Sequence, residues 1–265
     1  MTSNPISRWI VLIETEGFSE RDEAVQARLH NNLYDVTDSA LSRAGVSRDQ
    51  YTLQDHGDGL LILMSADTAP TRLVREFVRS LDDALARYRG ISTDAYRLRL
   101  RVGFGHGLVA LSHDHWTGAA INDLTRLLDA APVKQTLAQA EWAHLVLVVS
   151  EDVYQSVVRY APPGVDPAAF GPTELVTRHG KKLRAWVTVP GYSEAPGRPP
   201  EAEADLHSEA RGSQGNVKLG GTSGDYVSGS KIVYVPGEVI RPAGHTPPGP
   251  AQDPDDDWPR ETPES

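Results

Sequence analysis

Short apolar runs alternate with amphipathic segments in the first half of the chain, and this alternation limits the fold more than any other feature. Residues 9–13 form a continuous apolar run of strand length. Apolar residues then recur at helical spacing over 25–44, with Gly45 as a natural stop and Ser19 as a candidate N-cap. The chain is therefore expected to open with a buried strand followed by a helix that has one apolar face.

A hairpin is the next expected element. Residues 51–55 and 60–65 flank the sequence His-Gly-Asp58-Gly, in which two glycines permit the positive φ angles of a tight turn. Asp58 is expected at the tip of this hairpin. The remaining predicted elements are helices over 70–88, 118–128 and 151–160, and strands over 98–102, 143–150 and 183–189.

The order strand, helix, hairpin, helix, strand is typical of the split βαβ, ferredoxin-like plan. We interpret residues 1–192 as one α/β (α+β) domain. A composition rich in Pro, Gly and Asp after this point predicts a largely disordered tail, because such segments bury little apolar surface. The predicted divisions are a linker over 193–214, a short Gly-spaced, β-prone segment over 215–240, and a Pro/Asp-rich tail over 241–265.

Composition excludes several classes of function. A formal net charge of −10 argues against nonspecific binding to nucleic acid, which depends on neutralising phosphates. The absence of cysteine removes disulfides, thiolate catalysis and Cys-type metal sites. The apolar stretches are too short to span a bilayer, so we expect a cytoplasmic protein without a membrane partner.

Two carboxylates are candidates for a metal site. Glu14 ends the first predicted strand and Asp58 occupies the hairpin tip, so the two face one another if the hairpin pairs beside that strand. A pair of carboxylate ligands is what Mg²⁺ needs alongside substrate phosphates. The alternative is that Asp58 is a turn residue and Glu14 a solvated strand end.

A second candidate group lies on the predicted helix that begins near Gly118. Asn122 and Arg126 are four positions apart, so they project from one helix face, where Arg can contact phosphate oxygens. The alternative is a surface polar pair. His106, His113 and His115 cluster with Asp114, and we interpret them as polar loop residues rather than as a transition-metal site.

Together these segments resemble the catalytic domain of the class III nucleotidyl cyclases, the adenylyl and guanylyl cyclase family. Val11-Leu-Ile-Glu14-Thr-Glu-Gly-Phe-Ser resembles the first metal motif of that family, and Gly57-Asp58 matches the second. Arg101-Val-Gly-Phe-Gly-His-Gly-Leu-Val resembles its Arg-x-Gly-Ile-His-x-Gly-x-Val strand. Gly118-Ala-Ala-Ile-Asn122-Asp-Leu-Thr-Arg126-Leu resembles its Gly-x-x-Val-Asn-x-x-x-Arg-Leu segment. The resemblance spans residues 8 to 190.

The resemblance implies a nucleoside triphosphate ligand and divalent Mg²⁺ or Mn²⁺ held by Glu14 and Asp58. It implies that Asn122 and Arg126 stabilise the transition state across the interface of a homodimer, as pyrophosphate leaves. The Lys that binds phosphate in the family falls at about Arg178, with Lys181 and Lys182 nearby.

The resemblance also implies nucleotide contacts at Gly17 and Phe18 of the first motif. Two positions that read the base in the family hold Gln54 and His115 here, which matches neither the adenine set nor the guanine set. The first metal ligand is Glu14 in place of the usual Asp. The sequence therefore predicts a divergent member, and it leaves the base open.

Two functions remain from these patterns. The first is a divergent cyclase that binds a nucleoside triphosphate with metal and forms a cyclic nucleotide and pyrophosphate in signalling. The second is an inactive module with the same fold, which binds nucleotide or dimerises while the β-prone residues 215–240 mediate assembly with a signalling or defence partner.

Overall fold

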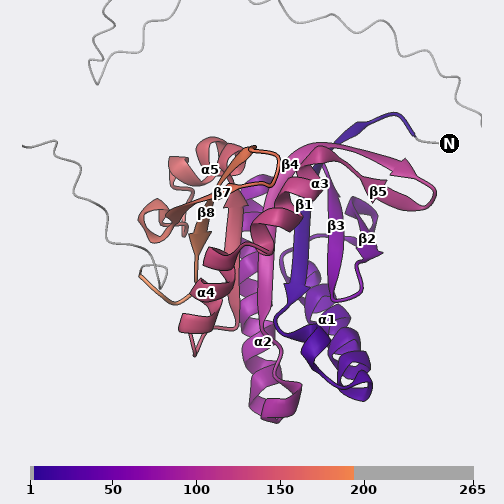
Figure 1. The fold of residues 1–265 in the computed structure, drawn as a ribbon, viewed down its shortest axis with the longest axis vertical. Helices are drawn as coiled ribbons and strands as arrows, with labels where there is room; N and C mark the ends of the chain where they lie inside the picture. Colours follow the sequence, from indigo (N-terminus) through magenta and orange to yellow (C-terminus); the bar gives the residue numbers. More distant parts are fainter. Residues whose placement is uncertain (1–2, 194–265) are drawn as a thin grey trace, which may run out of the picture. The chain divides into compact units, whose positions relative to one another are not determined.

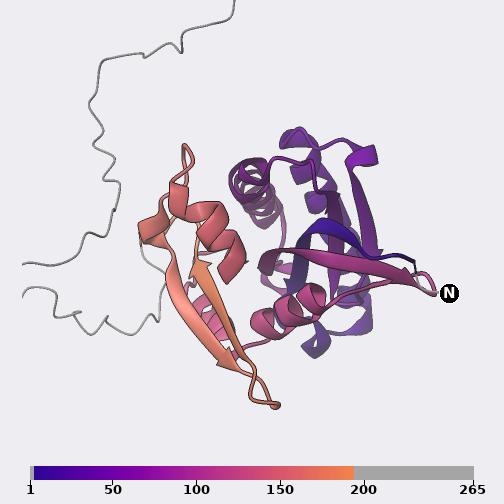
Figure 2. The ribbon, with the colours of Figure 1, turned by 90° about the horizontal axis from the view of Figure 1, so that it is seen from above.

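A computed structural model describes residues 3–193 of the chain. The predicted linker from residue 194 onward, the β-prone segment 215–240 and the tail lie outside these residues. Within the described part, the strands form one eight-stranded sheet in the order β2-β3-β1-β4-β6-β8-β7, with β5 paired to β4. Helices pack on both faces of this sheet (Figures 1 and 2).

The central strand β1 (Ile6–Thr15) is buried on both of its faces. Val11 and Ile13 belong to one hydrophobic cluster, whereas Ile10 and Leu12 belong to a second cluster on the opposite face. A strand covered on both sides needs apolar residues at every position, which explains the continuous apolar run in the sequence.

The first half of the domain has the predicted split βαβ topology. β1 pairs antiparallel with both β3 and β4, and β2 pairs with β3, giving the order β2-β3-β1-β4. This confirms the α/β fold class and its ferredoxin-like core. The further elements of this half are α1 (Glu23–Arg43), β2 (Tyr51–Asp55), β3 (Gly59–Ser65), α2 (Val78–Ile91) and β4 (Leu100–Ser112).

The second half extends the sheet by a crossover. β4 runs parallel to β6, and two helices connect them over the face opposite α1 and α2. Three elements here were not predicted from the sequence: β5, α4 and β7. The elements are β5 (His115–Thr117), α3 (Ala119–Leu128), α4 (Ala131–Gln139), β6 (Leu145–Ser150), α5 (Glu151–Ser156), β7 (Gly171–Val176) and β8 (Lys182–Thr188).

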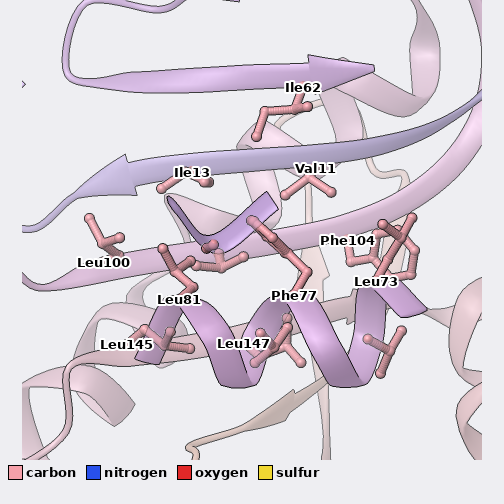
Figure 3. Packing of buried hydrophobic residues seen from close by; sticks show 14 of the residues in the cluster. Val11, Ile13, Ile62, Leu73, Phe77, Leu81, Leu100, Phe104, Leu145 and Leu147 are labelled. Atoms are coloured by element: carbon pink, nitrogen blue, oxygen red, sulfur yellow. The ribbon is translucent and has the colours of Figure 1, made fainter. Parts of the chain in front are cut away.

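Helix α2 covers the face of the sheet that Val11 and Ile13 point to. A π-helical turn, Arg72–Phe77, leads into α2, and Phe77 and Leu81 pack into the same cluster as these two β1 residues (Figure 3). Each fully buried side chain of this size contributes about 1.5–3 kcal/mol, so this contact anchors the helix. None of the helices within residues 3–193 has both the length and the apolar character needed to cross a bilayer.

The predicted start of α1 was wrong. Ser19 lies inside a 3-10 helix, Phe18–Glu20, and the N-cap of α1 is Asp22. Gly17 has a φ of 61°, so the chain turns sharply after β1 and forms the short helix before α1 begins. This extra turn places the segment between β1 and α1 along the edge of a cavity.

Candidate functional site

The hairpin carrying Asp58 is fixed tightly against the end of β1. Gly59 is opposite Glu14 in the β1–β3 register, and the backbone N–H of Thr15 donates to the carbonyl oxygen of Asp58 at 2.9 Å. A Cβ atom on Gly59 would lie 1.9 Å from the carbonyl oxygen of Ile13, so only glycine permits this approach. The hairpin therefore pairs beside the first strand, as the metal-site prediction required.

Glu14 is paired with Arg101, the residue opposite it on β4. Arg101 Nη2 lies 2.9 Å from Glu14 Oε2, and the two side chains are only 10% and 11% exposed. Burial raises the pKa of Glu14 above its ordinary value of 4.5, against the opposing effect of Arg101. The charges of Asp58 and Asp129 raise this pKa further, which indicates that three carboxylates lie near one another.

A cavity of about 580 Å³ opens beside these groups. This volume is in the range of about 300–1,000 Å³ that is typical of small-molecule sites. Arg101, Lys134 and Arg21 contribute positive charge to its walls, and Lys134 is paired with Asp129. We name it the metal-side cavity; its lining residues are Thr15, Glu16, Gly17, Phe18, Ser19, Glu20, Arg21, Asp58, Arg101, Asp129, Lys134 and Ala138.

The carboxylate oxygens that line this cavity are the type of ligand that a hard divalent cation binds. Carboxylate oxygens suit Mg²⁺ and Mn²⁺, and Mg²⁺ beside substrate phosphates needs only one or two carboxylates. Across residues 3–193, no group of three or more His, Asp or Glu side chains converges to hold a metal on protein ligands alone. Asp58 and Asp129 line the cavity and fit a cation that arrives with a phosphate ligand. Glu14 does not line it, and its carboxylate would reach such a cation only by leaving Arg101.

A second cavity, of about 420 Å³, lies between the end of α3 and the β7–β8 hairpin. Arg126 and Arg178, two of the predicted phosphate-contacting residues, both line it, and Asp129 lines this cavity as well as the first. We name it the cation-side cavity. Asn122 is exposed one turn before Arg126 on α3, so the predicted common helix face is present.

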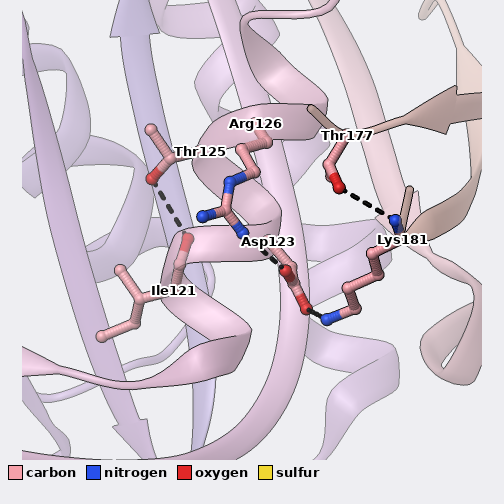
Figure 4. Close-up of polar contacts among 6 residues, drawn as sticks. All are labelled: Ile121, Asp123, Thr125, Arg126, Thr177 and Lys181. Atoms are coloured by element: carbon pink, nitrogen blue, oxygen red, sulfur yellow. Dashed lines mark hydrogen bonds and ion pairs between the residues drawn. The ribbon is translucent and has the colours of Figure 1, made fainter. Parts of the chain in front are cut away.

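Asp123 forms ion pairs with two basic side chains, Arg126 and Lys181, and the sequence analysis did not identify it. Its carboxylate accepts from Arg126 Nη1 at 3.2 Å and from Lys181 Nζ at 2.5 Å (Figure 4). The i, i+3 spacing of Asp123 and Arg126 was a visible signal in the sequence. The contact with Lys181, which is 58 positions away, depends on how the β7–β8 hairpin folds against α3.

The two predicted base-reading positions come close together at another place. Gln54 Oε1 accepts a hydrogen bond of 2.8 Å from the backbone N–H of Trp116, the neighbour of His115 on β5. His115 is exposed, and neither residue lines the two cavities just described. The described part of the chain therefore joins Gln54 and the His115 segment outside the lining of the metal-side cavity, and Gln54 also contacts His56, two residues before Asp58, at 3.4 Å.

The other histidines of the cluster do not converge. His106 contacts the hydroxyl of Ser7 at 2.9 Å, while His113 and Asp114 form the turn between β4 and β5 with positive φ angles. The interpretation as loop residues holds only for His113 and Asp114, because His106 lies within β4 and His115 within β5.

Comparison with known proteins identifies the fold. Neither a protein-family model nor a curated protein sequence matches the chain. Among solved structures, an adenylate/guanylate cyclase/hydrolase from Silicibacter pomeroyi is 17% identical, with a TM-score of 0.52 over 72% of this chain and 100% of that chain. The guanylyl cyclase Cya2 is 16% identical, with a TM-score of 0.49 over 74% of this chain and 99% of that chain. The first of these likenesses shows that the chain has the fold of a nucleotidyl cyclase catalytic domain, which confirms the resemblance at the level of fold.

Proposed function

We propose that this chain, which has the fold of a cyclase catalytic domain, binds a nucleoside triphosphate with Mg²⁺ or Mn²⁺ and converts it to a cyclic nucleotide and pyrophosphate. The observation that supports the proposal is that the hairpin pairs beside the end of β1, where Gly59 lies opposite Glu14 and Asp58 lines a cavity of about 580 Å³. Arg21, which makes no ion pair within residues 3–193, adds positive charge to the cavity, and Arg101 and Lys134 would contact the triphosphate by exchanging their pairs with Glu14 and Asp129 for phosphate oxygens.

The reaction forms a bond between the ribose 3′ oxygen and the α-phosphorus, while the bond from that phosphorus to pyrophosphate breaks. The proton of the 3′ hydroxyl passes to water. A bound divalent cation would supply charge neutralisation at the phosphates and would lower the pKa of this hydroxyl. Glu14 and Asp58 would hold the cation, and Arg101 and Lys134 would bind the phosphates that leave.

Asn122, Arg126 and Arg178 are proposed to act from a second copy of the chain. Arg126 and Arg178 line the cation-side cavity and not the metal-side cavity, and Asn122 is exposed. A homodimer would add these groups to the metal-side cavity of the partner, where they would stabilise the charge of the departing pyrophosphate.

The test is an incubation of the full chain with each of the four nucleoside triphosphates and Mn²⁺ or Mg²⁺, followed by mass-spectrometric identification of the product. A cyclic nucleotide is expected from at least one substrate, and Asp58→Ala should abolish it. Asp67→Ala is the matched control, because Asp67 is an exposed turn residue that lines neither cavity. Wild-type protein that forms no more product than Asp58→Ala refutes turnover.

A second candidate function is a nucleotide-binding module without turnover. Two ion pairs favour it. Glu14 is paired with Arg101 instead of being free to bind a metal, and Arg126 is paired with Asp123 instead of being free to bind phosphate. In this case, metal-dependent binding of a nucleoside triphosphate is expected without product. The segment 215–240 would then pass on the signal through assembly with a partner.

A further inference from the structure

A small cavity beside the metal-side cavity is lined only by charged side chains. Its volume is about 250 Å³, and its lining residues are Glu16, Arg21, Asp94, Arg97 and Arg99. It lies where the segment after β1 meets the 3-10 helix Asp94–Tyr96, which precedes β4. The volume is below the usual range of about 300–1,000 Å³ for drug-sized ligands, so a small ion suits it better than a nucleotide.

The two carboxylates of this cavity already have partners. Glu16 lies 3.0 Å from Arg99 Nη1, and Asp94 lies 2.7 Å from Arg89 Nη2. Arg99 is held further by the carbonyl oxygens of Leu137, Ala140 and Ala143, which it reaches through its other nitrogens. Arg99 is therefore a structural residue, and its pair with Glu16 is neutral.

The other two arginines keep their charge. Arg21 Nη1 donates to the carbonyl oxygen of Ala95 at 2.7 Å, and Arg97 Nη2 donates to the carbonyl oxygen of Glu141. These backbone contacts orient the two guanidinium groups without neutralising them, and within residues 3–193 neither group makes an ion pair. Arg97 Nε is also shielded from solvent without a hydrogen-bond partner in this part of the chain.

The neighbouring groups experience this positive charge. Burial lowers the pKa of Arg99, Glu16 opposes this effect, and Arg97 adds to it. Burial also lowers the pKa of His144, against the effect of Asp82, and the charges of Arg97 and Arg99 lower it further. A chain with a net charge of −10 thus concentrates positive charge at one small cavity.

We propose that Arg21 and Arg97 form a binding site for a small oxyanion of the phosphate class. Planar guanidinium groups bind phosphate oxygens through two parallel hydrogen bonds, and here two of them are held in place by backbone carbonyl groups. Glu16 and Arg21 line both this cavity and the metal-side cavity, so the anion would lie next to the proposed nucleotide site. The proposal does not depend on nucleotide binding.

The test is a calorimetric titration of the full chain with inorganic phosphate at pH 7.5, with ionic strength held constant by chloride. One saturable site is expected. Arg97→Gln should weaken binding by about 10-fold or more, because charge-assisted hydrogen bonds to an oxyanion are the strong ones. Arg97→Lys, which keeps the charge and loses the planar fork, should lie between wild type and Arg97→Gln.

Two control variants identify where the phosphate binds. Arg184→Gln removes an exposed arginine that lines none of the three cavities and should bind phosphate as the wild type does. Lys134→Gln alters only the metal-side cavity and should also have no effect. Binding that Lys134→Gln weakens and that both Arg97 variants leave intact would place the anion in the metal-side cavity and overturn the proposal. Absence of saturable binding, with circular dichroism showing folded protein, would overturn it as well.

Discussion

Removal of Arg101 tests the buried centre of the site most sharply. The side chains of Glu14 and Arg101 are 11% and 10% exposed and are joined at 2.9 Å between adjacent central strands. Arg101→Met would leave the Glu14 carboxylate buried without its cation. Breaking one partner of a buried ion pair costs about 3–5 kcal/mol, so the free energy of unfolding should fall by about that amount.

The double variant Glu14→Met, Arg101→Met should behave differently. It removes both charges, and apolar replacement of a buried pair is often neutral or stabilising. We therefore expect the double variant to be more stable than Arg101→Met alone, and close to the wild type. This non-additivity is the signature of a direct interaction between the two side chains.

Urea denaturation followed by circular dichroism measures the effect. With a slope of about 2 kcal/mol per M, a loss of about 4 kcal/mol lowers the midpoint by about 2 M. A loss below about 1 kcal/mol, or a double variant as unstable as Arg101→Met, would show that Glu14 is solvated and that the pair contributes little.

The pH dependence gives a second measure of the same pair. Burial raises the pKa of Glu14 above 4.5, and removal of Arg101 should raise it further. Between pH 4.5 and that raised pKa, folded Arg101→Met keeps a proton that the unfolded chain releases, so the folded state gains stability as the pH falls. The difference between Arg101→Met and the double variant should therefore shrink from pH 8 to pH 5.

Asp123→Asn removes the carboxylate that pairs with Arg126 and Lys181, so the affinity for a triphosphate should rise by up to about fivefold in a fluorescence titration. Because both ion pairs are partly exposed, the free energy of unfolding should change by about 1 kcal/mol or less. Gly59→Ala should lower the free energy of unfolding by about 1–3 kcal/mol in the same urea titration, because its Cβ would overlap the carbonyl oxygen of Ile13. Gly90→Ala is the control: a Cβ at this position in α2 meets open space, so the free energy of unfolding should rise by up to about 1 kcal/mol. Burial lowers the pKa of His144 below 6.5, so the unfolded chain binds a proton more readily and stability is lost as the pH falls from 6.5 toward the folded pKa. His144→Gln should flatten that loss between pH 7.5 and 5.5, and an unchanged slope would contradict this assignment.

The sequence predicted the first half of the fold because each element there carries a strong local signal. Residues 9–13 are apolar at every position because β1 is buried on both faces. α1, with 21 residues, is long enough for its buried apolar side chains to recur clearly at helical spacing. The second half was harder. α4 has only nine residues and contains Pro132 in its first turn, where proline begins a helix instead of breaking one. β7 begins with Gly171-Pro172, a turn-like pair that only an edge strand tolerates.

The position of the hairpin beside β1 was predictable, and the polar contacts around it were less so. Local patterns placed Glu14 at the end of a strand and Asp58 in a hairpin, and the structure confirms the assumption that this hairpin pairs beside β1. The pairing of Glu14 with Arg101 depends on the β1–β4 register, which brings together residues 87 positions apart. The contact of Asp123 with Lys181 likewise arises only after two separate elements pack. Long-range polar contacts of this kind leave no periodic signal in a sequence.

Metal-dependent binding of a nucleoside triphosphate at the metal-side cavity is the central claim, and one measurement tests it directly. The stability of the wild type and of Asp58→Ala is measured with each triphosphate, in Mn²⁺ and again in EDTA. With ligand at about 100 times its dissociation constant, wild type in Mn²⁺ should gain about 2.7 kcal/mol, while EDTA or Asp58→Ala should remove most of that gain. Equal stabilisation of Asp58→Ala, or no stabilisation by any triphosphate, would contradict the account.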